Sequence, residues 1–427
     1  MKSSRLERLT VNLDLEGTQI ELGKLAWSKV ERLAYFQFSP EFLQKQIPIS
    51  PFFLKPTATP ISAKASPFDG LHGVFNDSLP DGWGRLLLDR RLAKAGIDYT
   101  SLTPLDGLAA IGARGTGALS YVPEMKDETD HHHDLDWFVE QAENVQNDLD
   151  VAELDTLQAA QGGLAGARPK LMIGMTQTRD KYRLDFGHGL PPGYEHWLVK
   201  AKGKDDHSEI GAEEHAYALM ARKAGLNVAE TMVITTEKGH RLFATKRFDR
   251  TANGRLHMHT ASGLVYASHR EPALSYEQLL KLTRALTRYE PDVEALFRRM
   301  VFNVFSHNRD DHAKNHAFLM DGKGSWRIAP SYDLTFSSGP GGEHSATIAG
   351  EGKQPGFSHL MRVAAEANIS KADAASCIDE VHSAIAMWPK WADMAGLSRK
   401  RTQEISKYIN DDRNAPKASL ANGPSPN

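Results

Sequence analysis

Apolar side chains recur at helical spacing along residues 293–305, and Pro291 stands just before them. Positions three and four apart share one face of a helix, so the pattern predicts an amphipathic helix that ends near His307. The polar residues 307–315 are expected to form a loop beyond that helix. The apolar positions that carry this prediction are Val293, Leu296, Phe297, Met300, Val301, Val304 and Phe305.

Two short apolar runs follow, at residues 317–320 and 326–329, with the turn-forming sequence Asp-Gly-Lys-Gly between them. Such runs around an Asp-Gly turn predict a β-hairpin. Because a hairpin returns its second strand beside its first, Asn315 at the entry and Asp333 past the exit are expected to be spatial neighbours. Together with Asp310 they would offer carboxylate and amide oxygens, which suit Mg²⁺ when phosphate oxygens complete its coordination.

The order of these groups matches the catalytic loop of protein kinases: an aspartate, an asparagine five positions later, a hairpin and a second aspartate. In kinases the first aspartate accepts the proton of the attacking hydroxyl, and the other two residues hold metal. The triplet Asn308-Arg309-Asp310 differs from the usual kinase triplet only in having asparagine at the histidine position. A polar turn, in which Asp and Asn are present as turn formers, is the alternative interpretation.

Strands dominate the pattern before about residue 250, and helices dominate it after about residue 276. Residues 9–15 alternate as a half-buried strand does. Further strands are predicted at residues 171–175, 197–200, 231–236 and 241–248. Helices are predicted over residues 85–92, 213–224 and most of 276–408. The first of these is expected to pack through Leu86, Leu87 and Leu92, and the second to end at Gly225.

These patterns divide the chain into five parts. Residues 124–150 are acidic and polar and include three consecutive histidines, which we interpret as a solvated linker and not as a metal site. Residues 411–427 are rich in Pro, Ala, Ser and Asn, which is typical of a disordered tail. The predicted parts are a β-rich N-terminal module at 1–123, the linker at 124–150, an ATP-binding lobe at 151–250, a helical catalytic lobe at 251–410 and the tail at 411–427.

Basic residues accompany glycines and strands in the predicted ATP-binding lobe. Segment 161–170 carries three glycines with Arg168 and Lys170, although it lacks the spacing of a Walker loop. Its small residues would let backbone N–H groups approach phosphate, and a structural glycine turn is the alternative. Lys200 lies where kinases place a phosphate-binding lysine, but an edge-strand lysine facing water fits the pattern too. Glu214, in the first turn of the next helix, is a candidate partner for Lys200, the metal or the helix dipole.

Composition sets the protein class. At 427 residues, 41% hydrophobic and 25% charged, the chain is long enough for two or three globular domains. A formal net charge of −3 argues against a protein that coats nucleic acid. The single cysteine, Cys377, excludes internal disulfides and fits a reducing compartment. No apolar run approaches a membrane span and no apolar signal core is present, so we expect a cytoplasmic protein without a membrane partner.

With these residues in place, the chain resembles the HipA family of bacterial serine/threonine kinases, the toxins of type II toxin–antitoxin pairs. The resemblance covers nearly the whole length and implies an α+β, bilobal protein-kinase-like fold with an N-terminal β-rich module and a mainly helical C-terminal lobe. The segments that carry it are 75–92, 112–119, 165–170, 246–250, 310–315 and 332–333.

The resemblance also implies roles for individual residues. Asp310 is the expected catalytic residue, Asn315 and Asp333 are the expected metal ligands, and the implied cofactors are ATP and Mg²⁺. Residues 246–250 resemble the hinge that contacts adenine in the family. The implied ATP-binding positions are Ala165, Gly166, Ala167, Arg168, Pro169, Lys170, Lys200, Lys246, Arg247, Phe248, His312, Ala313, Lys314, Asn315, Tyr332 and Asp333.

Two departures from the family pattern bear on regulation and on adenine binding. Well-known members autophosphorylate a serine just before the phosphate loop, which ejects the loop and silences the kinase. Gly163 occupies that position here, and residues 161–170 contain no serine or threonine, so this switch is absent. The hinge begins with Lys246 where glutamate is common; a backbone contact to adenine would survive that exchange, whereas a side-chain contact would not.

The function implied by the resemblance is a kinase toxin that arrests growth by phosphorylating a translation component, such as an aminoacyl-tRNA synthetase. The implied partner is a small helix-turn-helix antitoxin of the HipB type, and DNA would be contacted mainly through it, since the chain shows no recognition helix of its own. One alternative is a catalytically weak, kinase-like corepressor that binds such an antitoxin on DNA. Another is a small-molecule phosphotransferase of the aminoglycoside-kinase type, against which the β-rich N-terminal module argues.

Overall fold

The computed structural model describes residues 6–94, 102–124, 133–151, 153–268, 271 and 274–409. The expected tail at 411–427, and His131 and His132 of the histidine tract, lie outside these ranges. The described residues form two compact units, which we treat separately. The first lies within Met1–His215, Ala229–Ser268 and His316–Ala329, and the second within Ala216–Val228, His269–Asn315 and Pro330–Asn427. No helix in the described ranges combines the length and the apolar character that crossing a membrane requires.

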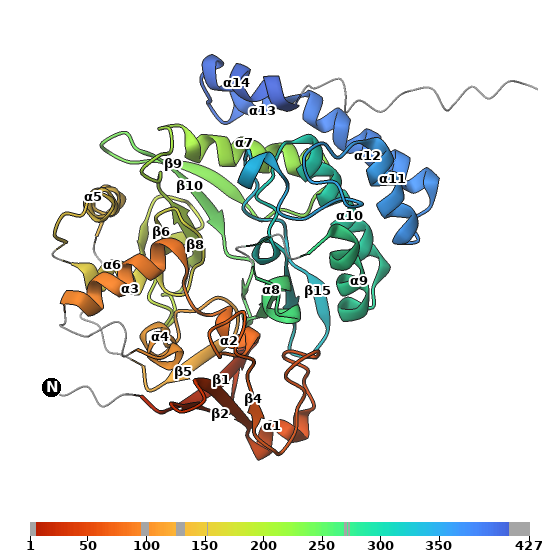
Figure 1. Cartoon of the computed structure of the whole chain (residues 1–427). Helices are drawn as coiled ribbons and strands as arrows, with labels where there is room; N and C mark the ends of the chain where they lie inside the picture. The colour runs from red at the N-terminus through yellow and green to blue at the C-terminus, as the bar shows by residue number, and fades with distance from the viewer. Residues whose placement is uncertain are drawn as a thin grey trace, which may run out of the picture. The chain divides into compact units, whose positions relative to one another are not determined.

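N-terminal residues of the first unit build an antiparallel sheet with strand order β4-β3-β2-β1-β5 (Figure 1). Leu9, Val11, Leu13 and Leu15 are buried and alternate with less buried neighbours, so the predicted half-buried strand is confirmed. The strands are β1 (Arg8–Leu15), β2 (Thr18–Ser28), β3 (Leu33–Phe38), β4 (Ile61–Ser62) and β5 (Leu119–Val122).

Four helices lie between these strands along the chain: α1 (Pro40–Lys45), α2 (Gly73–Asn76), α3 (Gly82–Lys94) and α4 (Pro104–Ile111). Helix α3 is the predicted helix over 85–92, and it buries Leu87 and Leu92 as expected. The expected contact through Leu86 is wrong, because that side chain is 39% exposed and Leu88 is buried instead. Residues two apart on a helix point to nearly opposite sides, so only one of these two leucines can face the core.

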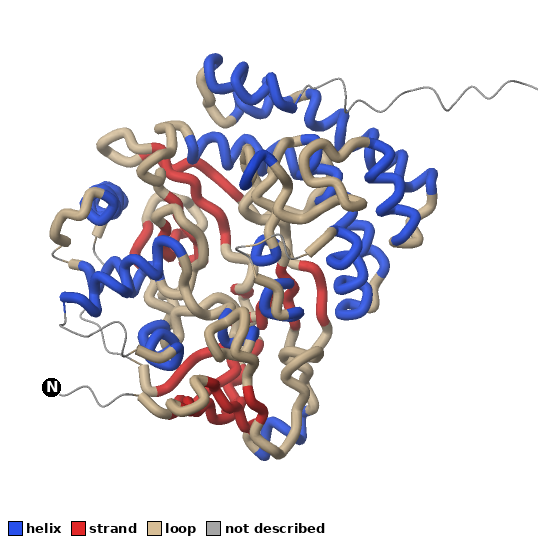
Figure 2. The backbone as a smooth tube through the Cα atoms, in the orientation of Figure 1, coloured by secondary structure: helices blue, strands red, loops and turns tan. Residues whose placement is uncertain are grey.

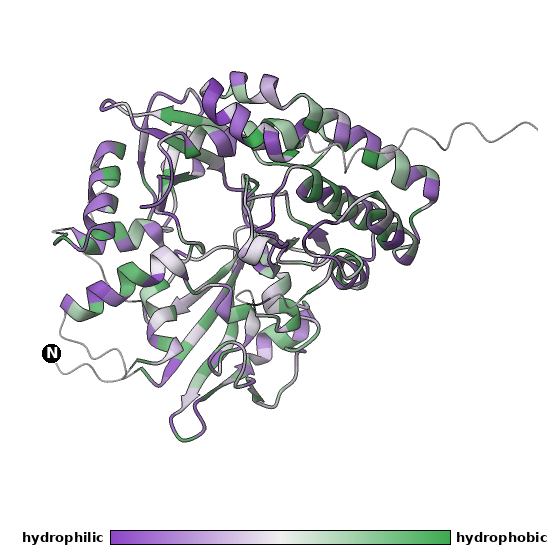
Figure 3. Ribbon diagram, turned by 45° about the horizontal axis from the view of Figure 1, so that its top comes forward, coloured by the Kyte–Doolittle hydropathy of each residue, from purple (hydrophilic) through white to green (hydrophobic). Residues whose placement is uncertain are grey.

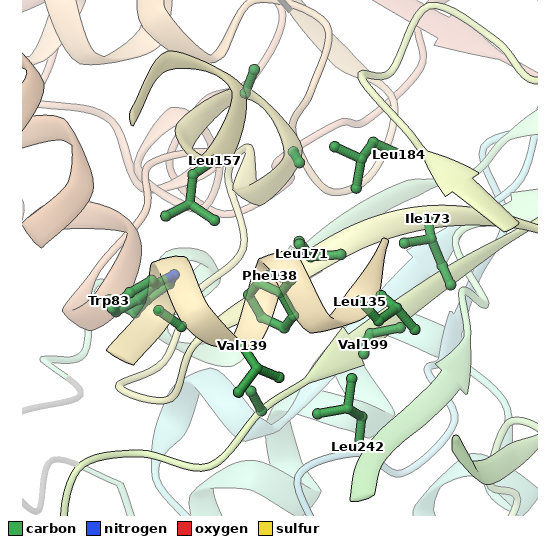
Figure 4. Close-up of a cluster of buried hydrophobic side chains, with 14 of the residues drawn as sticks. Trp83, Leu135, Phe138, Val139, Leu157, Leu171, Ile173, Leu184, Val199 and Leu242 are labelled. Carbon is green, nitrogen blue, oxygen red and sulfur yellow. The ribbon is translucent and has the colours of Figure 1, made fainter. Parts of the chain in front are cut away.

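A second antiparallel sheet has the order β7-β6-β8-β10-β9. Its strands are β6 (Lys170–Thr176), β7 (Tyr182–Leu184), β8 (Tyr194–Lys200), β9 (Thr231–Thr235) and β10 (Arg241–Lys246), and they confirm the four strands predicted in this region. One face of the sheet packs on helices α5 (Leu135–Gln146) and α6 (Leu154–Gln161). Figure 4 shows this core, with Phe138 of α5 beside strand residues such as Leu171.

The predicted linker over 124–150 is wrong for its second half, which is helix α5. Leu135, Phe138, Val139, Ala142 and Val145 recur at helical spacing and are all buried in the core of the second sheet. Asp134 caps the helix by accepting from the Trp137 N–H at 2.6 Å. The acidic composition of the segment obscured an amphipathic helix whose polar side faces solvent.

The predicted hairpin over 317–329 is confirmed and extended by a third strand. β14 (Ala317–Met320) pairs with both β15 (Trp326–Ile328) and β13 (His257–Thr260), all antiparallel. The first unit also contains the two-stranded ribbon of β11 (Arg250–Thr251) and β12 (Gly254–Arg255), and helix α8 (Ala261–Val265).

Most of the second unit is helical, as predicted (Figure 2). Helix α7 (Ile210–Lys223) begins in the first unit and ends before Gly225, whose φ of +82° suits a helix terminus. α10 contacts α9 and α12, and Figure 3 shows hydrophobic and hydrophilic residues mixed along these helices, as expected where one side is buried. The remaining helices are α9 (Tyr276–Thr287), α10 (Glu290–Phe305), α11 (Phe357–Glu366), α12 (Lys371–Ala386), α13 (Trp388–Met394) and α14 (Arg399–Ile409), with 3₁₀ turns η2 (Ala313–Asn315) and η3 (Pro340–Gly342).

Candidate functional site

The glycine-rich segment of the first unit is a short loop between α6 and β6. Gly162 and Gly166 have φ of +55° and +108°, conformations that favour glycine. Residues 162–164 are buried, whereas Ala165 and Ala167 at the tip are exposed. The loop leads into a strand and not into a helix, so any anion bound here would be held by backbone N–H groups and nearby cations without a helix N-terminus.

Two lysines stand directly opposite each other next to this loop. Lys170 of β6 pairs with Lys200 of β8 in the antiparallel register, so both side chains project from the same face of the sheet. This is the face opposite to the α5–α6 core, and both lysines are buried. Lys200 Nζ lies 2.7 Å from Glu214 Oε2, which confirms the predicted pairing, and Lys170 Nζ donates to the Ala165 carbonyl. The edge-strand alternative for Lys200 is wrong, because β8 lies between β6 and β10.

Arg168 differs from the expectation that it supplies free charge for phosphate. Its guanidinium binds Asp206 at 2.7 and 3.2 Å and Glu214 at 2.9 Å. Burial raises the pKa of the Asp206 carboxyl, but the hydrogen bonds and charge of Arg168 outweigh it and lower the pKa overall. Glu214 therefore joins Arg168 to Lys200, and Arg168 fastens the end of the glycine-rich loop to segment 201–214. The sequence reasoning missed Asp206, which occurs in a polar stretch with no periodic signal.

The segment predicted to contact adenine is held by its own side chains. Lys246 binds Glu195 at 2.7 Å, and the backbone N–H groups of Lys246 and Arg247 both bond to carbonyl oxygens at 2.9 Å. Arg247 is buried and binds Asp249 at 2.8 Å. Burial alone would raise the pKa of Asp249, but the charges of Arg247 and Arg250 hold it well below its usual range. An adenine contact at this segment would therefore use backbone oxygens and not the two basic side chains.

Asp310 of the second unit lies in the loop after α10. The helix ends at Phe305, and His307 adopts a left-handed φ of +57°, close to the predicted end. The Asp310 side chain is 55% exposed and is thus open to a hydroxyl group, with His312 Nε2 at 3.8 Å from its Oδ1. The Asn315 side-chain nitrogen donates to the Asp310 backbone carbonyl at 2.7 Å, which joins the expected base to the expected metal ligand.

The chain just before Asp333 is bonded to the same loop. The Tyr332 hydroxyl donates to the carbonyl of Lys314, so the residues immediately before Asp333 and Asn315 are in contact. Asp333 itself has φ of +51°, a left-handed conformation that aspartate tolerates better than most residues.

The donor set of Asn315 and Asp333 fits a hard cation. Because Asn315 uses its nitrogen toward Asp310, its amide oxygen is not occupied by that bond. Across the described ranges no group of three or more His, Cys, Asp and Glu side chains could hold a metal alone. Mg²⁺ does not need such a group, since it commonly takes one or two protein oxygens together with substrate phosphates and water.

Asp311, which the sequence reasoning passed over, anchors the segment that follows Asp333. Its carboxylate is buried and accepts from the Tyr276 hydroxyl and His344 Nδ1, both at 2.9 Å, and from the backbone N–H groups of Ser345 (2.8 Å) and Ala346 (3.2 Å). Burial and the neighbouring Asp311 charge raise the pKa of Tyr276 well above its usual value, so its hydroxyl stays protonated as a donor. The signal available in the sequence was the second aspartate of the Asp-Asp pair.

Arg309 ties the same segment to the loop that carries Asp310 through backbone oxygens. Its guanidinium donates to the carbonyls of Gly342 and Lys353, and its own carbonyl accepts from the Ser345 N–H at 3.1 Å. Backbone groups of residues 337–353 thus bind Arg309 and hold the segment against the loop that carries Asp310.

Family models match most of the chain. The HipA N-terminal domain matches residues 14–122, and the HipA-like C-terminal domain matches residues 162–388, more than half of the chain. The chain belongs to the HipA family. This membership and the described elements confirm the α+β, kinase-like fold with a β-rich N-terminal part and a mainly helical C-terminal part.

Solved structures agree with this assignment at the level of the fold. HipA of Shewanella oneidensis MR-1, solved in complex with HipB and its operator DNA, is 17% identical with a TM-score of 0.67 over 94% of this chain and 95% of that chain. The Helicobacter pylori proinflammatory kinase CtkA is 14% identical with a TM-score of 0.33, over 50% of this chain and 88% of that chain.

Proposed function

We propose that this HipA-family protein is an ATP- and Mg²⁺-dependent protein kinase that phosphorylates serine or threonine. The observation that supports the proposal best is the catalytic loop. An exposed Asp310 is bonded through its backbone carbonyl to the Asn315 amide, and Tyr332, directly before Asp333, is bonded to the carbonyl of Lys314, directly before Asn315.

In the proposed mechanism Asp310 orients the substrate hydroxyl and accepts its proton during transfer. Lys200, oriented by Glu214, and the backbone of the Gly166 loop hold the β- and γ-phosphates, and Lys170 adds a second positive charge on the same face. Asn315 and Asp333 would hold Mg²⁺, which supplies positive charge against the phosphate oxygens. Lys314, which is buried beside Asn315, neutralises charge that develops on the transferred group.

The substitution Asp310→Ala tests this proposal. We expect phosphoryl transfer from γ-labelled ATP to fall by about 10³-fold or more, because the variant loses the residue that positions the nucleophile. ATP affinity and melting temperature are expected to stay near the wild-type values, since the side chain is exposed. Asp379→Ala, which removes an exposed aspartate from α12, is the matched control. Transfer by Asp310→Ala at the wild-type rate would exclude Asp310 as the base.

We further propose that the substrate is a protein of the translation machinery, such as an aminoacyl-tRNA synthetase, and that phosphorylation arrests growth. The support is family membership, and the substrate is open to direct identification. Phosphoproteomics of cells that express the wild-type chain or Asp310→Ala should reveal serine or threonine sites that appear only with the wild type. If purified protein instead phosphorylates amines or sugars and no protein, a small-molecule phosphotransferase replaces this proposal.

A small helix-turn-helix antitoxin of the HipB type is the proposed partner, with DNA contacted mainly through it. The Shewanella HipA structure, which contains HipB and operator DNA, supports this partner class. Gel-shift titration of operator DNA with the antitoxin alone, with this chain alone and with both tests it. We expect the chain alone to leave DNA unshifted and the mixture to bind more tightly than the antitoxin. If the Asp310→Ala variant and the antitoxin together shift operator DNA as the wild-type mixture does, DNA binding does not need catalysis.

A further inference from the structure

Both backbone groups of Gly166, at the tip of the glycine-rich loop, are bonded to one short stretch of the N-terminal part of the chain. The Asp81 carboxylate accepts from the Gly166 N–H, and the Trp83 N–H donates to the Gly166 carbonyl at 3.1 Å. Asp81 directly precedes α3, and Trp83 lies in its first turn, where backbone N–H groups have no partner within the helix. The start of α3 thus provides one acceptor and one donor to the loop tip.

Glycine is required on both sides of this contact. A Cβ added at Gly82 would lie 2.7 Å from the Gly166 carbonyl oxygen and 2.9 Å from the Ala167 Cα, and Gly82 has φ of +45°. Gly166 has φ of +108°, and a Cβ there would lie 2.4 Å from Lys170 Nζ. The atoms that a Cβ at Gly82 would meet belong to the backbone of Gly166 and Ala167 and cannot move aside as a flexible side chain can. The close approach of the two segments therefore depends on having no side chain at Gly82.

The two bonds fix two consecutive peptide planes of the loop. The Gly166 N–H belongs to the 165–166 peptide and its carbonyl to the 166–167 peptide, so Asp81 and Trp83 together set the orientation of the residue with the greatest conformational freedom. On the far side of the tip, Arg168 is held by Asp206 and Glu214, and Glu214 also binds Lys200. The loop is therefore fixed at both ends of its exposed part, and each fixed point comes from a different segment of the chain.

We propose that Asp81 is a positioning residue for the phosphate loop: it holds the Gly166 peptide in the orientation in which the loop receives the phosphates of ATP. This inference rests on the proposed kinase function. Asp81 acts through Gly166 and does not contact the nucleotide. Without it the tip must be ordered by the nucleotide itself, and that loss of conformational freedom weakens ATP binding.

The Asp81 carboxylate could instead occupy the position at the Gly166 N–H that a phosphate oxygen of ATP would take. Its removal would then have the opposite effect on ATP binding. If Asp81 competed with the nucleotide for the Gly166 N–H, its removal would tighten ATP binding. Asparagine separates these possibilities, because its amide oxygen can still accept from the N–H while its negative charge is gone.

The experiment compares Asp81→Ala, Asp81→Asn and the control Asp89→Ala with the wild-type chain. Asp89 lies within α3, and its carboxylate pairs with Arg85 on the surface. We expect Asp81→Ala to raise the KM for ATP and the dissociation constant for ATP about tenfold, with kcat changed less than twofold. Asp81→Asn should restore both to within about threefold of wild type, and Asp89→Ala should match wild type.

Hydrogen exchange keeps the test informative if a variant is less stable. Amides of residues 162–168 should exchange faster in Asp81→Ala than in wild type and Asp89→Ala, while amides of the second sheet keep their protection. Unchanged ATP binding and exchange in Asp81→Ala would overturn the inference, as would tighter ATP binding by Asp81→Asn. If the wild type neither binds ATP nor transfers phosphate, the proposed kinase function fails and the inference fails with it. If the wild type does both and Asp81→Ala matches it, only the inference fails.

Discussion

Gly163 occupies a site that excludes even one methyl group. Its N–H donates to the Arg114 carbonyl at 3.1 Å, and an added Cβ would lie 2.5 Å from the Ser78 carbonyl oxygen and 3.2 Å from the Gly115 Cα. These neighbours are backbone atoms, so relief requires the loop or the N-terminal part to shift. We expect Gly163→Ala to lower the free energy of unfolding by about 1–3 kcal/mol, measured by urea denaturation.

The neighbouring position Gly115 provides the control, because a Cβ there meets no atom closer than 3.6 Å. Gly115→Ala should therefore leave the urea midpoint near the wild-type value, whereas Gly163→Ser should lower it at least as much as Gly163→Ala. The Gly163→Ser side chain does not fit the observed loop, because its Cβ would meet the same backbone atoms. Wild-type stability of Gly163→Ser would contradict this argument and show that the loop readily takes up another conformation.

The buried carboxylate of Asp311 holds the segment 337–353 in its position. The Asp311 carboxylate accepts the four hydrogen bonds described above, and two of the donors are backbone N–H groups of this segment. Asp311→Ala would leave these donors without their acceptor and release the segment from the loop that carries Asp310. We expect faster proteolytic cleavage within 337–353 and a fall in phosphoryl transfer of about tenfold or more, with ATP affinity nearly unchanged.

Glu343→Ala is the matched control for that prediction. Glu343 lies in the same segment, is partly exposed and pairs with Lys353 at 3.4 Å, an interaction worth little at the surface. Its removal should change neither cleavage nor transfer. If Asp311→Ala resists protease as the wild type does, the segment is held by Arg309 and its backbone contacts without help from Asp311.

Local patterns predicted the elements well, and long-range contacts explain what they missed. Helix α10 and the β14–β15 hairpin follow from spacing and turn chemistry within about twenty residues, so Asp310, Asn315 and the Asp333 region could be placed from sequence. Helix α5 was missed because its acidic side dominated the composition. The contacts of Asp81 with Gly166 and of Asp206 with Arg168 join segments 85 and 38 positions apart, and no local pattern specifies them.

On the scale of the whole chain, the predicted N-terminal module and the predicted ATP-binding strands share the first unit. A buried ionic network joins them: Asp249 accepts from the Gly117 N–H at 2.7 Å, and Arg250 donates to the Gly117 carbonyl at 2.9 Å. Burial and, after it, the charge of Arg247 lower the pKa of Arg250 to about 9. Both arginines thus remain charged at neutral pH, and the network does not titrate between pH 4 and 7.

We expect two buried histidines to contribute to acid sensitivity in that pH range instead. Burial lowers the pKa of both His72 and His257 from 6.5 to about 4, against single hydrogen bonds to the carbonyls of Ile61 (3.1 Å) and Ile49 (2.9 Å). The second ring nitrogen of each is buried and has no hydrogen-bond partner among the described residues, so a proton added there would be an unpaired buried charge. Both residues are therefore neutral in the folded protein down to about pH 4.

The free energy of unfolding should consequently fall as the pH is lowered from 6.5 to 4. In this window the unfolded chain binds protons at both histidines while the folded chain does not, so stability rises with pH, by up to 1.36 kcal/mol per pH unit for each proton. Because each pKa falls from 6.5 to about 4, each histidine should lower the free energy of unfolding by up to about 3 kcal/mol at pH 4. Urea denaturation at half-unit pH steps measures the slope.

His257→Gln should reduce this slope by up to the roughly 1.36 kcal/mol per pH unit that one proton contributes, and its side-chain nitrogen can still donate to the Ile49 carbonyl. His188→Gln is the control, because the side chain of His188 is 62% exposed, and it should leave the slope unchanged. A flat profile from pH 7 to 4.5 would mean that these two imidazoles are protonated, or reach water, in the folded protein.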